Sequence, residues 1–336
     1  MDNVLLELLA LLAGFALLSK GSDALVEGGE DIANHFRVSP LTIGLTVVAW
    51  GTSLPELVIS TWSAIHGKAG ESLGTVVGSN VVNLGLVLGA CAVILPATIE
   101  SKVRLRDGIW LIASLLLLVL TLKDGVLTRW DGLILVGAFL YYQWGLLRAG
   151  RAEGIAARAM DAKSESDEPA PIGESTLKRD LIKVLLGSLA IGVGARTAMW
   201  GGEMLALRVG MAPTVVGLTV FALGTSLPEL FAGIASARRG QAEMGLGNVL
   251  GSNVFNVLAA LGIAVVTSPI ADAGGEVHKV LTRDIPVALG FSVMLLALPF
   301  LPREWGRMKG VAVLGGYALY TAYLMHVGVV HYDPPT

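Results

Sequence analysis

The sequence holds few of the charged residues that soluble domains carry at their surfaces. Charged residues make up 15% of its 336 positions, whereas a soluble domain carries about 25%. The single cysteine, Cys91, excludes a disulfide scaffold and a cysteine-based zinc or iron–sulfur site. The net charge of −3 gives no reason to expect nucleic acid as a partner, and no nucleotide-binding motif occurs. An ordinary soluble enzyme is therefore excluded, and we expect no cofactor.

What the sequence does contain is a series of long apolar runs. Hydrophobic residues make up 54% of the chain, and a helix needs about 20 mostly apolar residues to cross a bilayer. The first run has no basic residues before it, so we expect a retained helix and not a signal peptide. The runs cover residues 3–30, 39–65, 71–97, 107–122, 127–147, 179–207, 212–237, 243–267, 284–301 and 308–328. They predict an all-α, polytopic protein with ten transmembrane helices in a lipid bilayer.

The only long polar stretch divides these helices into two groups of five. Residues 149–178 are polar and contain proline, which is typical of a linker. The predicted halves are therefore 1–148 and 179–336. Lys and Arg gather in this linker and in the alternate loops on the same side, which predicts a cytoplasmic linker and an N terminus outside. Because the chain has no targeting segment or regulatory insert, we expect a prokaryotic inner membrane.

The two halves contain a duplicated segment. Residues 39–90 and 212–263 align without a gap at a constant offset of 173, and both contain GTSLPEL followed by GSNVxN. Because each half has five crossings, the second copy enters the membrane from the opposite side. Inverted repeats of this kind are typical of secondary transporters, whose sites lie near the bilayer midplane where the repeats meet.

Each GTSLPEL segment places a carboxylate, Glu56 or Glu229, in the middle of an apolar run. A carboxylate at the bilayer centre costs about 2.5–3.5 kcal/mol or more, and neither has a Lys or Arg close by in sequence. We expect a bound cation or a proton to compensate. Thr52 and Thr225 stand four residues earlier, so each hydroxyl shares a helix face with its carboxylate.

Further oxygen atoms accompany the two carboxylates. Pro55 and Pro228 disturb the turn before them, so we expect the carbonyls of Ala49 and Ala222 to face a site and not to bond within their helices. The next helix of each copy adds a Ser and an Asn at i and i+4: Ser79 and Asn83, and Ser252 and Asn256. Hydroxyl, carbonyl, amide and carboxylate oxygens suit hard cations such as Na⁺ and Ca²⁺.

Each of these residues also has a purely structural interpretation. A Ser or Thr in a membrane helix often bonds its own i−4 carbonyl, a proline can simply kink the helix, and a buried Glu can anchor a hydrogen bond. The occurrence of the whole set in two copies favours a site. The acidic residues Asp23, Glu27, Glu30 and Asp31 are expected at the cytoplasmic end of the first helix, not in the ion site.

GTSLPE on one helix and GSNxxN on the next, repeated across a polar linker, resemble the alpha-repeats of the sodium/calcium exchangers, in the calcium:cation antiporter superfamily. The resemblance implies ions bound between the second, third, seventh and eighth helices, while the first and sixth helices slide during alternating access. It adds Ser53 and Ser226 to the expected ligands. Several exchangers carry Asp where this chain has Asn256, which makes K⁺-dependent exchange less expected. The short linker has no room for calcium-sensing domains.

Three functions follow from these residues. The first is a Na⁺/Ca²⁺ antiporter that works as a monomer and binds both ions in turn at Glu56 and Glu229. The second is an H⁺/Ca²⁺ antiporter on the same scaffold, because the same carboxylates can carry protons. The third is a cation sensor or assembly subunit that does not transport, which we rank last because the linker offers no partner-binding domain.

Overall fold

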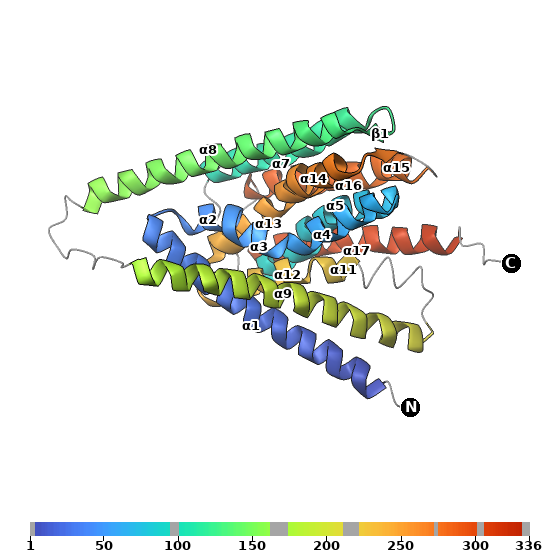
Figure 1. The fold of residues 1–336 in the computed structure, drawn as a ribbon, viewed down its shortest axis with the longest axis horizontal. Helices are drawn as coiled ribbons and strands as arrows, with labels where there is room; N and C mark the ends of the chain where they lie inside the picture. The colour runs from blue at the N-terminus through green and yellow to red at the C-terminus, as the bar shows by residue number, and fades with distance from the viewer. Residues whose placement is uncertain are drawn as a thin grey trace.

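A computed structural model describes residues 4–94, 101–161, 174–210, 222–271, 275–300 and 306–330 as a bundle of helices (Figure 1). The predicted all-α architecture is confirmed. Its one addition in the described chain is a pair of two-residue strands, β1 (Val126–Leu127) and β2 (Ile270–Ala271), which pair antiparallel. This pair joins the turn before α8 to the turn after α14, so it ties the two halves together at one end of the bundle.

The first half begins with α1 (Val4–Phe36). A broken helix follows, made of α2 (Pro40–Ile43), the π-helical η1 (Gly44–Val48), α3 (Ala49–Thr52) and α4 (Leu54–Ile65). The third unit is α5 (Ala69–Val82), the π-helical η2 (Asn83–Val87) and α6 (Leu88–Ile94). The long helices α7 (Ser101–Leu122) and α8 (Arg129–Asp161) complete this half.

The second half repeats this order. It contains α9 (Glu174–Arg208), then α11 (Ala222–Thr225) and α12 (Leu227–Arg238). The unit α13 (Ala242–Phe255), π-helical η4 (Asn256–Ala260) and α14 (Leu261–Thr267) follows. The next consists of α15 (Glu276–Lys279), π-helical η5 (Val280–Asp284), α16 (Ile285–Ala297) and the short η6 (Leu298–Phe300), and α17 (Gly306–Val330) is last.

These units follow the order of the ten predicted crossings. In the described part of the chain, six helices are long and apolar enough to span a membrane, or seven if the bent pair Pro40–Thr52 and Leu54–Ile65 counts as one span. The helices α8 and α9 extend into the predicted linker at 149–178, as far as Asp161 and from Glu174 onward. Residues 162–173 of that linker, 95–97 of the third predicted helix and 212–221 of the second repeat lie outside the described residues.

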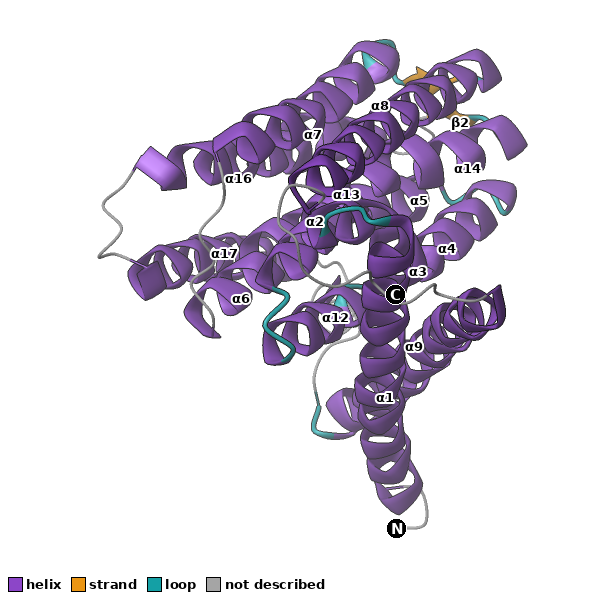
Figure 2. Ribbon diagram, turned by 90° about the vertical axis from the view of Figure 1, so that its left-hand side faces the viewer, coloured by secondary structure: helices purple, strands orange, loops and turns teal. Residues whose placement is uncertain are grey.

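The core of the bundle is centred on α13 and α14. Every residue from Met244 to Phe255 is buried, as expected of a helix that other helices surround on all sides. Figure 2 places α13 among the helices of both halves, whereas α1 and α9 lie together at one side. The GSNVxN segment of the second repeat therefore lies deep in the protein.

The pair α1 and α9 is joined through glycines that recur every seventh residue. Gly14, Gly21 and Gly28 on α1 match three glycines on α9 at the 173 offset, Gly187, Gly194 and Gly201. A methyl group at Gly21 would lie 2.9 Å from the Gly187 carbonyl oxygen. Small residues let helix backbones approach this closely in membranes.

The same contacts show the direction of the two helices. Gly14 approaches Ala198, Gly21 approaches Gly187, and Gly28 approaches Asp180, so residue numbers rise on α1 as they fall on α9. The helices α1 and α9 are therefore antiparallel. Since they occupy equivalent positions in the two halves, this is the relationship that an inverted repeat requires.

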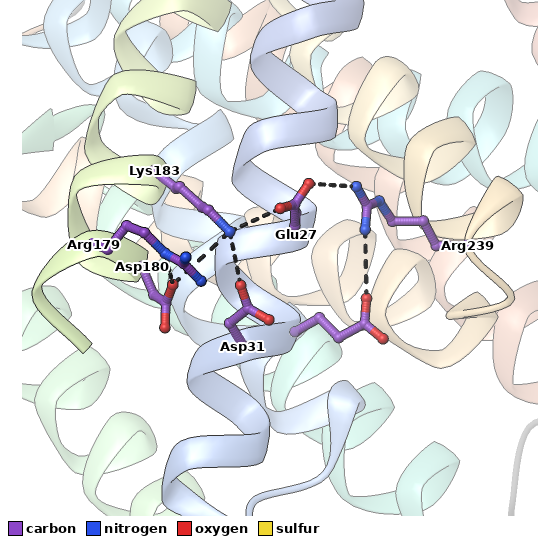
Figure 3. A network of polar contacts seen from close by, with 7 residues as sticks. Glu27, Asp31, Arg179, Asp180, Lys183 and Arg239 are labelled. Atoms are coloured by element: carbon purple, nitrogen blue, oxygen red, sulfur yellow. Dashed lines mark hydrogen bonds and ion pairs between the residues drawn. The ribbon is translucent and has the colours of Figure 1, made fainter. Parts of the chain in front are cut away.

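Ion pairs reinforce both ends of the α1–α9 pair. At one end, Arg208 makes two hydrogen bonds to Glu7, of 2.9 and 2.6 Å. At the other, Lys183 Nζ lies 2.7 Å from Glu27 and 2.9 Å from Asp31 (Figure 3). Glu27 and Asp31, near the end of the first helix, thus hold α1 against α9.

The second end is also tied to the turn between α12 and α13. Arg239 lies 2.8 Å from Glu27 Oε2 and 3.8 Å from Glu30 Oε2 (Figure 3). Gln241 Nε2 donates to Glu30 Oε1 at 2.9 Å. Glu27 therefore joins three elements, α1, α9 and the turn after α12.

Candidate functional site

The two GTSLPEL segments break their helices in the same way. Ser53 ends α3 with φ −89° and ψ 9°, and Ser226 ends α11 with φ −95° and ψ 4°. In the first copy the segments before and after the break meet at 47°. Glu56 and Glu229 each stand in the first turn of the following half-helix, where the helix dipole favours negative charge. Both Glu side chains are completely buried.

The expectation that the Ala49 carbonyl does not bond within its own helix was wrong. The Ala49 carbonyl stays bonded within the helix, because it accepts the Ser53 N–H at 3.1 Å. Proline lacks the N–H that would reach residue i−4, so Pro55 removes a donor from the carbonyl of Gly51 and not from that of Ala49. The Ala49 oxygen is nevertheless within 3.5 Å of the Ser252 hydroxyl, because a carbonyl has a second lone pair. In the second copy, Ala222 begins α11, and Ser226 N–H bonds Leu223 at 3.2 Å.

Hydroxyl groups of the two repeats meet in two equivalent contacts. Thr52 Oγ1 lies 3.3 Å from Ser252 Oγ, and Thr225 Oγ1 lies 3.2 Å from Ser79 Oγ. The 173 offset converts one pair into the other. Each contact joins a broken helix of one half to the GSNVxN helix of the other half, so the two copies form one site together.

The carboxylates lie beside these hydroxyls. Ser79 Oγ donates to Glu56 Oε1 at 3.3 Å, and Ser53 Oγ donates to Glu229 Oε1 at 2.9 Å. Neither Glu forms an ion pair with any Lys, Arg or His that the structure describes. Among the described groups, hydroxyl hydrogen bonds and the N-terminal ends of the two half-helices therefore stabilise the buried carboxylates, and no basic side chain does.

Several oxygen atoms of the predicted ligand set are buried without a hydrogen-bond partner among the described residues. Burying a polar group without a partner costs free energy, so such atoms are few in native proteins and each requires an explanation. Fifteen side-chain nitrogen and oxygen atoms are in this state in the described chain, and five of them are oxygens of the predicted ligand set. These five are Glu56 Oε2, Glu229 Oε2, Ser226 Oγ, Asn83 Oδ1 and Asn256 Oδ1.

The structure also brings in asparagines that our motif analysis missed. Asn80 Nδ2 donates to the Asn253 carbonyl at 3.1 Å, and Asn80 Oδ1 accepts from Asn256 Nδ2 at 3.4 Å. Asn80 and Asn253 belong to the repeated GSN triplets, so the repeat itself was the signal. Asn248 lies one turn before Ser252 and contacts Thr52, and no repeated motif indicates it.

Hydrogen bonds join seven of the predicted side chains into three groups, namely Thr52 with Ser252, Ser53 with Glu229, and Ser79 with both Glu56 and Thr225. Asn83 and Asn256 begin η2 and η4, and π-helical turns inside α-helices often mark functional sites. With oxygens from carboxylate, hydroxyl, amide and backbone groups, the arrangement suits a hard cation such as Na⁺ or Ca²⁺.

The family model described as sodium/calcium exchanger protein matches residues 6–148 and 181–326, which is most of the chain. The chain belongs to the sodium/calcium exchanger family. As a member of it, the protein is a membrane antiporter of cations and not an enzyme. The family resemblance read from the two alpha-repeats is therefore confirmed.

Relatives that match over nearly the whole of both chains support this family membership. It is 31% identical to the sodium/calcium exchanger MaX1 of Methanosarcina acetivorans, over 95% of this chain and 98% of that one. It is 31% identical to the inner membrane protein YrbG of Escherichia coli strain K12, over 96% and 97%. Its structure is similar to that of the sodium-calcium exchanger NCX_Mj soaked with Na⁺ and Sr²⁺, with a TM-score of 0.78 and 30% identity over 95% of this chain and 98% of that one.

Proposed function

We propose that this exchanger is a Na⁺/Ca²⁺ antiporter that binds the two ions alternately at Glu56 and Glu229. The observation that carries the proposal is the group of buried oxygen atoms on both carboxylates, Ser226, Asn83 and Asn256 that have no hydrogen-bond partner in the described part of the chain. A cation would neutralise the charge and satisfy these atoms at once. Since two buried carboxylates are costly to leave empty, the release of one ion is coupled to the binding of the next, which makes transport an exchange.

We extend the proposal to the remaining ligands by their hydrogen-bonded contacts. We assign Ser53 and Ser79 to the site because they donate to Glu229 and Glu56, and Thr225 because it contacts Ser79. Thr52 and Ser252 are assigned because they form the equivalent contact at the 173 offset, and the Ala49 carbonyl because it accepts from both hydroxyls. Ala222 joins them as the equivalent of Ala49. The relatives MaX1 and NCX_Mj, whose names describe sodium/calcium exchangers, support this assignment of ions.

The same proposal includes the organisation in the membrane. The halves 1–148 and 179–336 form two five-helix repeats of opposite orientation, and the antiparallel packing of α1 and α9 supports this division. The excess of Lys and Arg in the central segment and in the loops on its side favours a cytoplasmic linker and an N terminus outside. We place the protein in a prokaryotic inner membrane and expect a monomer to transport.

Proton coupling is the second candidate, because Glu56 and Glu229 have no basic partner among the described residues and can each take up a proton. The deciding experiment compares two driving forces in proteoliposomes. Vesicles loaded with Na⁺ and diluted into Na⁺-free buffer test Na⁺ coupling, and Na⁺-free vesicles with a pH gradient test proton coupling.

Ca²⁺ uptake that requires internal Na⁺ supports the proposal. Uptake driven by the pH gradient alone would transfer the protein to H⁺/Ca²⁺ exchange with the same residues. Ca²⁺ binding by folded protein without flux under either gradient would favour a sensor or assembly subunit.

A further inference from the structure

Asn248 is a completely buried residue of α13 that contacts both halves of the site. Its Oδ1 accepts the Thr52 hydroxyl at 3.0 Å, and its Nδ2 donates to the Glu229 carbonyl at 3.4 Å. A carbonyl oxygen can only accept, so the contact with Glu229 requires the amide nitrogen there. The amide oxygen must then face Thr52. The orientation of the amide is thus fixed by its neighbours.

This orientation determines what the Thr52 hydroxyl can offer to an ion. A hydroxyl has one proton and two lone pairs, and it binds a cation only through a lone pair. Within 3.5 Å the proton has three acceptors, namely Asn248 Oδ1 at 3.0 Å, the Ala49 carbonyl at 3.3 Å and Ser252 Oγ at 3.3 Å, and the Glu229 carboxylate also interacts with this hydroxyl. Donation to Asn248 leaves the Thr52 lone pairs, the Ala49 carbonyl and Ser252 available as ligands. Donation to Ala49 would use up one of them.

The first repeat has no such amide at the equivalent position. Thr75 stands 173 residues before Asn248. Its hydroxyl donates to the Glu71 carbonyl of its own helix at 2.8 Å and not to a residue of the site. The two halves of the site match at Thr52 and Thr225 and at Ser252 and Ser79, but they differ at Asn248 and Thr75.

We propose that Asn248 is a positioning residue that takes up the Thr52 proton and so holds Thr52 and Ala49 ready to bind the cation. Because only one repeat carries it, the two pseudo-equivalent halves of the site bind ions with different affinity. This inference rests on the proposed function, since it assumes that Thr52 and Ala49 are ligands. It adds a residue outside both repeated motifs to the machinery.

The experiment measures Na⁺-driven Ca²⁺ uptake by the full chain in proteoliposomes as a function of Ca²⁺ concentration. Asn248→Ala should raise the KM for Ca²⁺ by roughly two- to twelvefold, the range that one hydrogen bond supplies, with a nearly unchanged maximal rate. Thr75→Ala, the matched control in the other repeat, should leave the KM unchanged.

A double-mutant cycle separates positioning from a general structural role. If Asn248 acts through Thr52, then Asn248→Ala in a Thr52→Val background should change the KM by less than about twofold, because interacting residues are not additive. An equal change in both backgrounds would overturn the proposal, as would an unchanged KM in Asn248→Ala alone.

Two further variants keep the outcomes distinct. If Asn248→Ala does not fold, Asn248→Thr is measured instead. This variant places the residue of the first repeat, Thr75, at position 248, and it should also raise the KM for Ca²⁺. Normal flux by Glu229→Gln would instead refute the proposed ion site, whatever Asn248 does.

Discussion

Ser53 and Glu229 lie 176 positions apart in the sequence, and the Ser53 hydroxyl donates to Glu229 Oε1 at 2.9 Å. Ser53 is the residue at which the first broken helix bends, and Glu229 follows the bend of the second. The backbone break of one repeat thus supplies a hydrogen bond to the carboxylate of the other. This contact makes the Glu229 carboxylate dependent on both halves of the chain.

Removing that hydroxyl should weaken cation binding. Ser53→Ala leaves Glu229 Oε1 without its donor and removes an expected ligand, and an unsatisfied buried acceptor costs about 1–3 kcal/mol. We expect a higher KM for Ca²⁺ in the proteoliposome assay. Ser63→Ala is the matched control, because Ser63 is buried on α4 and its hydroxyl has no partner among the described residues. Equal KM values for the two variants would refute a role for Ser53 at the site.

The glycine contacts between α1 and α9 predict a stability difference between two glycines of one helix. A methyl group at Gly194 would lie 2.8 Å from the Leu18 backbone nitrogen, whereas one at Gly192 meets nothing within 4 Å. Gly194→Ala should lower the free energy of unfolding by about 1–3 kcal/mol, as overpacking does. Gly192→Ala should raise it by up to about 1 kcal/mol, because Ala favours helix. Thermal unfolding in detergent measures both, and a Gly194→Ala protein as stable as Gly192→Ala would contradict the close packing.

The ion pairs of Arg239 with α1 predict that this residue holds α1 against α12. Arg239→Gln removes the ion pairs with Glu27 and Glu30, and one such pair stabilises by about 0.2–1 kcal/mol. The apolar cluster that α1 covers includes Ala235 of α12. We therefore introduce Ala235→Cys in a Cys91→Ser background and measure how fast its thiol reacts with a thiol reagent. Adding Arg239→Gln should make this labelling up to about fivefold faster, because α1 covers the thiol less firmly.

Arg238→Gln provides the control for that measurement. Arg238 is the neighbouring exposed residue and forms no ion pair with the described residues. Arg238→Gln should leave the labelling rate of the Ala235→Cys thiol unchanged. Equal rates in Arg239→Gln and Arg238→Gln would mean that Arg239 does not hold α1.

The fold and most of the candidate site could be predicted from the sequence because both depend on short, local sequence patterns. Runs of apolar residues correspond to the order of the helical units, and the two copies of GTSLPEL and GSNVxN identify Glu56, Glu229 and the Ser79 and Ser252 positions. The seven-residue spacing of Gly14, Gly21 and Gly28 and its repetition 173 residues later can also be read from the sequence. The sequence does not show that these glycines pack α1 against α9.

What could not be predicted are the contacts between the halves. The offset shows that Thr52 corresponds to Thr225, but it does not show that Thr52 meets Ser252. The Ala49 carbonyl was expected to be free of its helix because Pro55 disturbs the preceding turn, but that disturbance does not prevent Ala49 from accepting the Ser53 N–H. Asn248 was missed because a search for repeated residues overlooks positions where the repeats differ, and its role depends on Thr52 and Glu229, which come from distant segments.

The central claim is that Glu56 and Glu229 bind the transported cations. The most direct test measures Ca²⁺ uptake into Na⁺-loaded proteoliposomes by the wild type, Glu56→Gln and Glu229→Gln. Glu71→Gln serves as the control, since Glu71 is exposed and pairs with Lys68 at 3.0 Å. We predict that both buried-site variants insert and fold but take up no Ca²⁺, while Glu71→Gln transports like the wild type. Uptake at the wild-type rate by either buried-site variant would contradict the claim.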